Sequence, residues 1–341
     1  MTSLDYTFSG KKVQYFFDAS YVQLERHVAK NKLVIITDEN VYRRHPGLSA
    51  YKAIVMAAGE QYKNQSTVDF LINELIRLEA DRKTFIVGIG GGVVTDVTGF
   101  TASVYMRGLR FGFVPTTILS QVDASIGGKN GIDTGVYKNL VGLIRQPDFI
   151  LFDFSLLETL PEEQWINGFA EIIKHACIKD AELFNFLEQH QLNDFRENRT
   201  LLAELIQRNV VIKSRVVEKD EFEQGDRKLL NFGHTVGHAI ENIYNLPHGY
   251  AISIGMAAAC KLSEALNNFS AGDTKRVLTL LQQYGLPVSL KIETKKIFEI
   301  LKMDKKRVSA DMNFILLNKI GDAVIKSIPL IELEALLNKI L

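Results

Sequence analysis

The stretch IVGIGGGVVTDVTGF (residues 86–100) places an apolar run directly before three glycines and a segment that can form a helix. Glycines without Cβ atoms let backbone amides approach a phosphate, and the N-terminus of the following helix favours negative charge. The stretch therefore predicts a strand–turn–helix unit that can hold the pyrophosphate of a dinucleotide. Because the glycines do not follow the G-x-G-x-x-G pattern, an ordinary tight turn between a strand and a helix stays an alternative.

The flanking sequence repeats this alternation of short apolar runs and amphipathic segments. Further strands are predicted at residues 32–40, 53–60 and 111–117, and a helix is predicted at residues 67–80. Strands that alternate with helices are typical of a mostly parallel sheet covered by helices on both faces. Asp38 and Asn40, at the end of the first of these strands, can bind ribose hydroxyls or simply cap a helix.

The pattern changes near Asp153. From there on, long helical periodicities dominate, as in LLAELIQRNVVIKSRVVEKDE (residues 201–221) and AISIGMAAACKLSEALNN (residues 251–268), with one possible short strand, NFILLN (residues 313–318). We predict an α/β domain with a mostly parallel sheet over residues 1–155 and an all-α domain over residues 156–341.

Composition excludes several classes of protein. Forty basic residues balance forty acidic ones among the 341, so nothing favours nucleic acid or a membrane surface as a partner. No apolar run reaches the length of a membrane span, and residues 1–12 lack the apolar core of a signal peptide. The two cysteines, Cys177 and Cys260, are far apart in the sequence, which argues against a disulfide framework and fits a reducing cytoplasm.

A polar stretch between apolar flanks runs from Val114 to Gly142. Lys129, Lys138 and Asn139 within it can form an anion-binding site. A solvated surface loop is the alternative, but the paired glycines at positions 127 and 128 indicate that the backbone passes close to another group.

Three of the seven histidines lie in LLNFGHTVGHAIENIYNLPHG (residues 229–249). His234 and His238 are four residues apart, a spacing that can chelate zinc from one helix face. Thr235 follows His234, so the H-E-x-x-H protease motif is not supported. Glycines 233 and 237 within a helical run each cost about 1 kcal/mol relative to alanine, which indicates close packing or a ligand.

A carboxylate is available as a further metal ligand. Glu171, in NGFAEIIKHACIKD (residues 167–180), has the apolar neighbours Ala170, Ile172 and Ile173. A glutamate on a helix commonly faces solvent, but one that is buried must be paired. With two of the histidines it would give three ligands and one open position, as in catalytic zinc sites.

Taken in order, these motifs resemble the 3-dehydroquinate synthase family. The matching segments are GGGVVTDVTGF, YMRG, VPTTILSQVDASIGGKNGID, KNLVG, GFAEIIKHA, LLNFGHTVGHAIE and HGYAISIGM, which span roughly residues 30–310. The resemblance implies an N-terminal NAD-binding domain and a C-terminal helical domain that binds substrate and a divalent metal, usually zinc, with cobalt as an alternative. It also implies a homodimer and the shikimate pathway of aromatic amino-acid biosynthesis.

The resemblance also implies roles for individual residues. Glu171, His234 and His248 match the metal ligands, which makes His238 a polar active-site residue and not a ligand. The positions that match NAD contacts are Asp38, Asn40, Glu60, Lys63, Gly91, Gly92, Val93, Asp96, Thr116, Thr117, Asp123, Lys129, Lys138, Thr159 and Leu160. Those that match residues around the substrate are Asp123, Lys129, Asn139, Lys174, Lys213, Arg227, Asn231 and His238, with Lys305 on the phosphate side and Arg107 reaching across the dimer interface.

The implied reaction converts 3-deoxy-D-arabino-heptulosonate 7-phosphate to 3-dehydroquinate and phosphate, with NAD⁺ used and restored in each turnover. The leaving phosphate can serve as the base for its own elimination. One departure is Tyr250, which stands where the family usually has glutamate; we expect it to affect the orientation of His248 and not to prevent metal binding.

Three rival functions stay open. Another sugar-phosphate cyclase of the same fold would use a substrate without the carboxylate, although Arg227 and Lys213 favour a carboxylate-bearing one. A metal-dependent polyol dehydrogenase of the glycerol-dehydrogenase type would release NADH and would not need Lys129, Asn139 and Lys305. A non-catalytic protein with a structural zinc usually has four closed ligands, often cysteines, and the cysteines here are misplaced for that.

Overall fold

The computed structural model describes residues 2–135, 137–291, 293–302, 307–308 and 311–340. The chain forms two compact units. Unit 1 consists of Met1–Gln164 and Arg199–Phe222, and unit 2 consists of Trp165–Asn198 and Glu223–Leu341. This division differs from the single boundary near residue 155, because helix α7 (Arg199–Lys219) packs with unit 1. Its partners there, among them Asp123, are far away in the sequence, so helical periodicity alone could not assign it.

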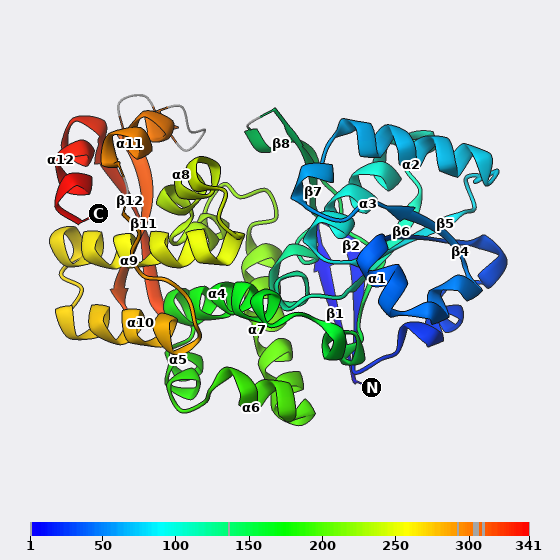
Figure 1. The fold of residues 1–341 in the computed structure, drawn as a ribbon, viewed down its shortest axis with the longest axis horizontal. Coiled ribbons are helices and arrows are strands. Elements are labelled where there is room, and N and C mark those ends of the chain that lie inside the picture. The colour runs from blue at the N-terminus through cyan, green and yellow to red at the C-terminus, as the bar shows by residue number, and fades with distance from the viewer. Residues whose placement is uncertain (1, 136, 292, 303–306, 309–310, 341) are drawn as a thin grey trace. The chain divides into compact units, whose positions relative to one another are not determined.

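Unit 1 is built on a seven-stranded sheet in the order β1-β2-β9-β6-β5-β3-β4. Figure 1 labels β1, β2, β4, β5 and β6 of this sheet. β1 and β2 are antiparallel, and the pairings from β2 through to β4 are parallel. The strands are β1 (Thr2–Phe8), β2 (Lys11–Phe17), β3 (Leu33–Asp38), β4 (Lys52–Met56), β5 (Phe85–Gly90), β6 (Arg110–Pro115) and β9 (Phe149–Phe152).

The predicted mostly parallel α/β domain is confirmed. β3, β4, β5 and β6 form at the four apolar runs, and helix α2 (Gln65–Arg77) forms at the predicted amphipathic segment. The central strands are buried along nearly their whole length, which explains their uninterrupted apolar sequences. The remaining helices of this part are α1 (Glu39–Arg44) and α3 (Gly92–Val104).

The order of the strands defines where ligands bind in such a sheet. From β3 the chain moves outward to β4, and it then returns to the other side of β3 with β5 and continues to β6. The switch point therefore lies between β3 and β5, where Asp38 ends β3 and Gly91 follows β5. In open α/β sheets ligands bind at this position, beyond the carboxyl ends of the strands.

The polar stretch from Val114 to Gly142 forms a short π-helical turn, η6 (Ser120–Ala124), and a two-stranded hairpin of β7 (Lys129–Thr134) and β8 (Tyr137–Ile144). Gly127 and Gly128 have left-handed φ angles of 97° and 70°. A Cβ atom on Gly128 would lie 2.7 Å from the Gln146 amide nitrogen and 3.0 Å from the Arg145 carbonyl carbon. The predicted close approach of the backbone is therefore confirmed.

Unit 2 is mainly helical. Its helices are α4 (Glu162–Lys179, whose first residues belong to unit 1), α5 (Ala181–Glu188), α6 (Leu192–Glu197), α8 (His234–Tyr244), α9 (His248–Asn267), α10 (Ala271–Gln283), α11 (Thr294–Lys302) and α12 (Leu330–Ile340). It also contains an antiparallel sheet of β10 (Arg307–Val308), β11 (Asp311–Lys319) and β12 (Asp322–Pro329). The predicted strand at residues 313–318 is confirmed, but the all-α expectation needs this correction. The missed signal is Gly321, whose φ of 87° turns β11 back into β12.

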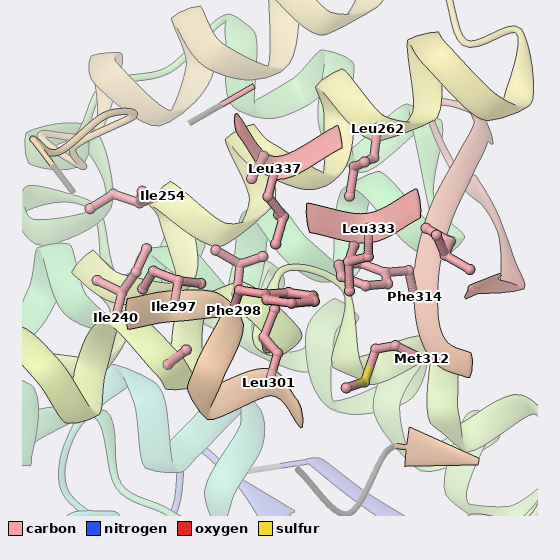
Figure 2. Close-up of a cluster of buried hydrophobic side chains, with 14 of the residues drawn as sticks. Ile240, Ile254, Leu262, Ile297, Phe298, Leu301, Met312, Phe314, Leu333 and Leu337 are labelled. Atoms are coloured by element: carbon pink, nitrogen blue, oxygen red, sulfur yellow. The ribbon is translucent and has the colours of Figure 1, made fainter. Parts of the chain in front are cut away.

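One apolar core joins the sheet and helices of unit 2. Figure 2 shows Ile240 and Ile254 of α8 and α9 in a cluster that also includes residues of α11, β11 and α12, such as Phe298, Phe314 and Leu333. This core holds α8 and α9 together at the place where the histidines lie. None of the described helices combines the length and apolar character needed to cross a bilayer.

Candidate functional site

Three side chains from three helices of unit 2 converge. Glu171 lies in α4, His234 is the first residue of α8 and His248 is the first residue of α9. The Nε2 atoms of His234 and His248 lie 3.5 and 3.4 Å from Glu171 Oε1. Ligand atoms of these residues all lie within 4.8 Å of one another, so one cation could contact all three. We call these residues, with Glu241, the histidine cluster.

Glycines bring α8 and α9 together. Gly233 precedes α8 with a left-handed φ of 79°, so it is not inside the helix as the sequence suggested. A Cβ atom on Gly255 of α9 would lie 2.0 Å from the Gly233 carbonyl oxygen, and one on Gly237 would lie 2.8 Å from Ile252 Cδ1. Close backbone packing therefore explains the glycines of this motif.

A further backbone contact ties α9 to α4. The Asn167 side-chain oxygen accepts a hydrogen bond of 2.5 Å from the Gly249 amide. Asn167 lies one turn before Glu171 on α4, and Gly249 follows His248. This contact therefore places the backbone of His248 against the helix that carries Glu171.

The outer nitrogens of the two histidines also have partners. His234 Nδ1 lies 3.1 Å from the Phe232 carbonyl oxygen, and His248 Nδ1 lies 3.3 Å from Glu241 Oε2. An imidazole that donates from Nδ1 has its Nε2 lone pair available for a metal. Both rings therefore suit ligation through Nε2, on the side of Glu171.

Charge in the histidine cluster favours a cation. Burial by itself lowers the pKa of His248, but hydrogen bonds to Glu171 and Glu241 and their negative charge raise it to about 10. Glu171 is fully buried, as expected from its apolar neighbours, and it also pairs with Lys174 through Oε2. A carboxylate and two imidazoles fit zinc or cobalt, with a coordination position left for substrate.

His238 shares this region. Its ring centroid lies 5.1 Å from that of His234 and 6.1 Å from that of His248. His238, Glu241 and His248 form a second group whose ligand atoms lie within 4.8 Å. Which group holds a metal stays a prediction; the directed Nδ1 atoms of His234 and His248 favour the group with Glu171.

Unit 1 holds a second polar centre, around Lys63. The Lys63 ammonium lies 2.5 Å from Asp96 Oδ2 and donates a 2.6 Å hydrogen bond to the Asn139 side-chain oxygen. The backbone N–H of Asn139 donates a 2.7 Å hydrogen bond to the Asp133 carboxylate, and Asn139 has a left-handed φ of 51°. We call Lys63, Asp96, Asp133 and Asn139 the lysine cluster. Because Lys63 contacts both Asp96 and Asn139, it joins a predicted NAD residue to a predicted substrate residue.

The Lys63 ammonium is paired within the lysine cluster. Burial alone would lower the pKa of Lys63, but Asp96 and Glu60 outweigh it and raise the pKa. Burial raises the pKa of Asp96, and the Lys63 ammonium opposes this. The nearby ion pair between Lys138 and Glu60 is weaker than that between Lys63 and Asp96, because its atoms are 3.5 Å apart and both side chains are partly exposed.

The glycine turn lies beside this cluster. Gly91 is the N-cap of α3, and Gly92, Val93 and Asp96 follow in its first turns. A Cβ atom on Gly90 would lie 2.5 Å from Val94, so tight strand–helix packing accounts for that glycine. The free amides at the start of α3 still suit an anion.

The other predicted cofactor positions follow strands of the same sheet. Asp38 caps α1 by accepting hydrogen bonds from Asn40 and Val41. The capping role named as an alternative is thus present, and the contact to ribose stays a prediction. The remaining positions are Thr116 and Thr117 directly after β6, and Thr159 and Leu160 at the end of the short helical segment Phe154–Thr159 that follows β9.

Predicted substrate residues occur in both units. In unit 1, Lys213 of α7 lies 2.8 Å from Asp123 Oδ1 and is nearly buried, whereas Lys129 on β7 is exposed. Arg107 is exposed, with a left-handed φ of 64°.

In unit 2, Arg227 is 1% exposed, and Asn231 donates a 2.7 Å hydrogen bond to Glu223. Lys174 lies beside Glu171 of the histidine cluster. Lys305 lies outside the described residues.

Sequence reasoning missed three residues that support these clusters: Asn167, Glu241 and Asp133. Helical spacing could have identified Glu241, because it lies three residues after His238 within one predicted helix. Nothing in the sequence pairs Asn167 with Gly249 or Asp133 with Asn139.

Comparison with known proteins identifies the family of the chain. Residues 53–167 match the family model of the 3-dehydroquinate synthase N-terminal part, and residues 168–307 match that of its C-terminal part. The 3-dehydroquinate synthase of Campylobacter concisus is 41% identical over 316 residues, which cover 89% of this chain and 90% of that protein.

Solved structures of cyclases are also similar. A 2-deoxy-scyllo-inosose synthase complexed with carbaglucose-6-phosphate, NAD⁺ and Co²⁺ has a TM-score of 0.88 and 26% identity, covering 100% of both chains. The 2-epi-5-epi-valiolone synthase of Streptomyces hygroscopicus, with NAD⁺ and Zn²⁺ bound, has a TM-score of 0.87 and 27% identity, covering 100% of this chain and 98% of that one.

A probable glycerol dehydrogenase from Sinorhizobium meliloti is 13% identical with a TM-score of 0.63, covering 98% of this chain and 97% of that one, and it shares the fold alone. The two family models together span both units of the fold, and the curated relative aligns over about nine-tenths of each chain. The chain therefore belongs to the 3-dehydroquinate synthase family.

Proposed function

We propose that this chain is a 3-dehydroquinate synthase, which converts 3-deoxy-D-arabino-heptulosonate 7-phosphate to 3-dehydroquinate and phosphate. Its class would be that of the phosphate-eliminating carbon–oxygen lyases, acting in the shikimate pathway. The observation that carries the proposal is the match to 3-dehydroquinate synthases along most of the chain. The histidine and lysine clusters support it, because they supply the residues that a metal and a dinucleotide require.

Two bound groups take part in the proposed reaction. When bound, NAD⁺ would supply reversible oxidation and a zinc or cobalt ion would acidify the hydroxyl to be oxidised. Glu171, His234 and His248 would hold the metal. The amides at the start of α3, with Lys63 and Asp96, would hold the dinucleotide.

The side chains of the chain itself bind and orient the substrate. Asn139, fixed by Lys63 and Asp133, and the exposed Lys129 would contact the phosphate. Arg227 is nearly fully buried, and a planar guanidinium donates two parallel hydrogen bonds to a carboxylate. Arg227 therefore favours a substrate that carries a carboxylate.

We also propose a homodimer in the cytoplasm. Arg107 adopts a left-handed conformation on an exposed turn beside Met106, which is also left-handed and 43% exposed. Strained backbone persists where function requires it, and contact with a second copy is such a function. Both cysteines are unpaired and buried, which is compatible with a reducing compartment.

The proposal is tested by incubating zinc-loaded protein with the heptulosonate phosphate and a catalytic amount of NAD⁺, and by following phosphate, 3-dehydroquinate and NADH. We expect equal phosphate and dehydroquinate, many turnovers per NAD⁺ and no accumulation of NADH. Turnover only with a hexose or heptulose phosphate that lacks the carboxylate would replace the proposal with a sister cyclase. Accumulation of NADH without phosphate release would instead indicate a polyol dehydrogenase.

A further inference from the structure

The two histidines that face Glu171 are held in different ways. His234 is anchored by a backbone carbonyl, that of Phe232, which no side-chain substitution removes. His248 is anchored by the carboxylate of Glu241, which reaches it from α8 and is only 6% exposed. The orientation of the His248 ring therefore depends on a replaceable side chain.

The position of Glu241 suits the task of orienting this ring. Glu171 lies 3.4 Å from Nε2 of His248 and Glu241 lies 3.3 Å from Nδ1, so the two carboxylates lie at opposite nitrogens of one imidazole. A carboxylate at Nδ1 fixes the tautomer, limits rotation of the ring and makes Nε2 a stronger donor. Glu171 and His234 are then the other two ligands of the three-ligand group.

We propose that Glu241 is a positioning residue of the metal centre: it accepts a hydrogen bond from His248 Nδ1 and directs His248 Nε2 at the metal that Glu171 and His234 also bind. This inference rests on the metal assignment of the proposed function. It assigns Glu241 to the outer shell of the metal, although a group of His238, Glu241 and His248 could also surround an ion.

The backbone of His248 is fixed independently of Glu241. The hydrogen bond from Gly249 to Asn167 holds the first turn of α9 against α4, and Gly255 holds α9 against α8. Replacement of Glu241 therefore frees the ring without moving the helix. The effect appears in metal binding and not in the fold.

The test uses Glu241→Ala and Glu241→Gln in the full-length protein, stripped of metal and then titrated with Co²⁺ against a competing chelator. Asn242→Ala is the matched control, because Asn242 is the next residue of α8 and is exposed. Affinity, the visible d–d absorption of bound cobalt and the melting temperature of the metal-free protein are recorded for each variant. His234→Ala gives the effect of losing an inner ligand.

Loss of an outer-shell partner of a metal-bound histidine typically weakens affinity about 10- to 100-fold, which is the loss expected for Glu241→Ala. Glu241→Gln keeps a neutral hydrogen-bond acceptor about half as strong, so we expect metal affinity to fall by about 3- to 10-fold. Both should still bind one cobalt with a shifted d–d spectrum. Asn242→Ala should match the wild type, and the metal-free variants should melt close to it.

Wild-type affinity and spectrum in both Glu241 variants would overturn the positioning role. A loss in both as large as that of His234→Ala would overturn it as well, because Glu241 would then be a ligand. If Glu241→Ala does not fold, the intermediate loss in the similarly shaped Glu241→Gln decides between these results. Failure of the wild type to bind one cobalt per chain would overturn the metal assignment itself, which separates the two claims.

Discussion

The lysine cluster of unit 1 and the histidine cluster of unit 2 differ in which groups pair with their buried charges. In the lysine cluster the Lys63 ammonium faces the Asp96 carboxylate and donates a hydrogen bond to the Asn139 side-chain oxygen. In the histidine cluster two buried carboxylates, Glu171 and Glu241, lie on either side of His248. The first centre is built around a buried ammonium, whereas the second is built around imidazoles that can bind an added cation. Removal of a charge should therefore affect stability in unit 1 and metal binding in unit 2.

The largest effect is expected from Glu171→Ala. It removes an inner ligand, so the loss of metal affinity should exceed the roughly 10- to 100-fold typical of outer-shell changes, and turnover should be lost with it. Metal content per chain after dialysis measures this directly. Asp96→Asn, a carboxylate change in the lysine cluster, should leave the metal content at the wild-type level. Equal metal loss in both variants would remove the distinction between the centres.

Lys63→Met should give the largest loss of stability. It leaves the Asp96 carboxylate, which is 17% exposed, without its cation, and breaking a largely buried pair in this way costs up to about 3–5 kcal/mol. Urea unfolding of the metal-free protein measures the change. The control Arg77→Met removes the exposed pair with Glu74, which should cost under about 1 kcal/mol. Similar losses in the two variants would show that the lysine cluster is not held by its charges.

Gly249→Ala tests whether backbone contact sets the histidine cluster. The new Cβ atom would lie 2.1 Å from the Asn167 carbonyl oxygen, so α9 must move away from α4. We expect a loss near or above the upper end of the about 1–3 kcal/mol range for overpacking, together with weaker metal binding.

Gly272→Ala in α10 is the matched control. The nearest atom to its new Cβ is 3.7 Å away, and the substitution should raise stability by about 0.4–1 kcal/mol. If Gly249→Ala bound metal as tightly as the wild type, the contact between α4 and α9 would not be what positions His248.

The smallest effect in this series is stabilisation by the metal itself. At a free zinc concentration of 100 times the dissociation constant, the folded state should gain about 2.7 kcal/mol. Hydrogen exchange should slow in α8 and α9 and stay unchanged in α2 and α3 of unit 1. Uniform protection of both units, or none, would contradict a metal centre confined to the histidine cluster.

These two centres also differ in how far the sequence could predict them. Short apolar runs and the glycine turn predicted β3 to β6 and α3, because each signal is local. The carboxylate at Glu171 and the histidines were predicted as candidates by residue type and spacing. Their partners were not predicted, because Glu241 contacts His248 across a loop and Asn167 accepts a hydrogen bond from Gly249, 82 residues away in the sequence.

Long-range packing explains the remaining errors about the fold. Helix α7 has the same periodicity as the helices of unit 2, and only its contacts with β1 and with Asp123 place it in unit 1. Of the β11–β12 hairpin only β11 was predicted, because β11 is strongly apolar. In β12, exposed residues are interspersed with partly buried ones. A sequence pattern identifies an element more readily than it identifies the partner of that element.

The metal assignment is tested most directly by a crystal structure of the zinc-loaded protein with anomalous diffraction collected at the zinc edge. We predict one strong peak, from a metal bound by Glu171 Oε1, His234 Nε2 and His248 Nε2, with Glu241 at Nδ1 of His248 and no peak in the lysine cluster. A peak bonded to His238, Glu241 and His248 would contradict it.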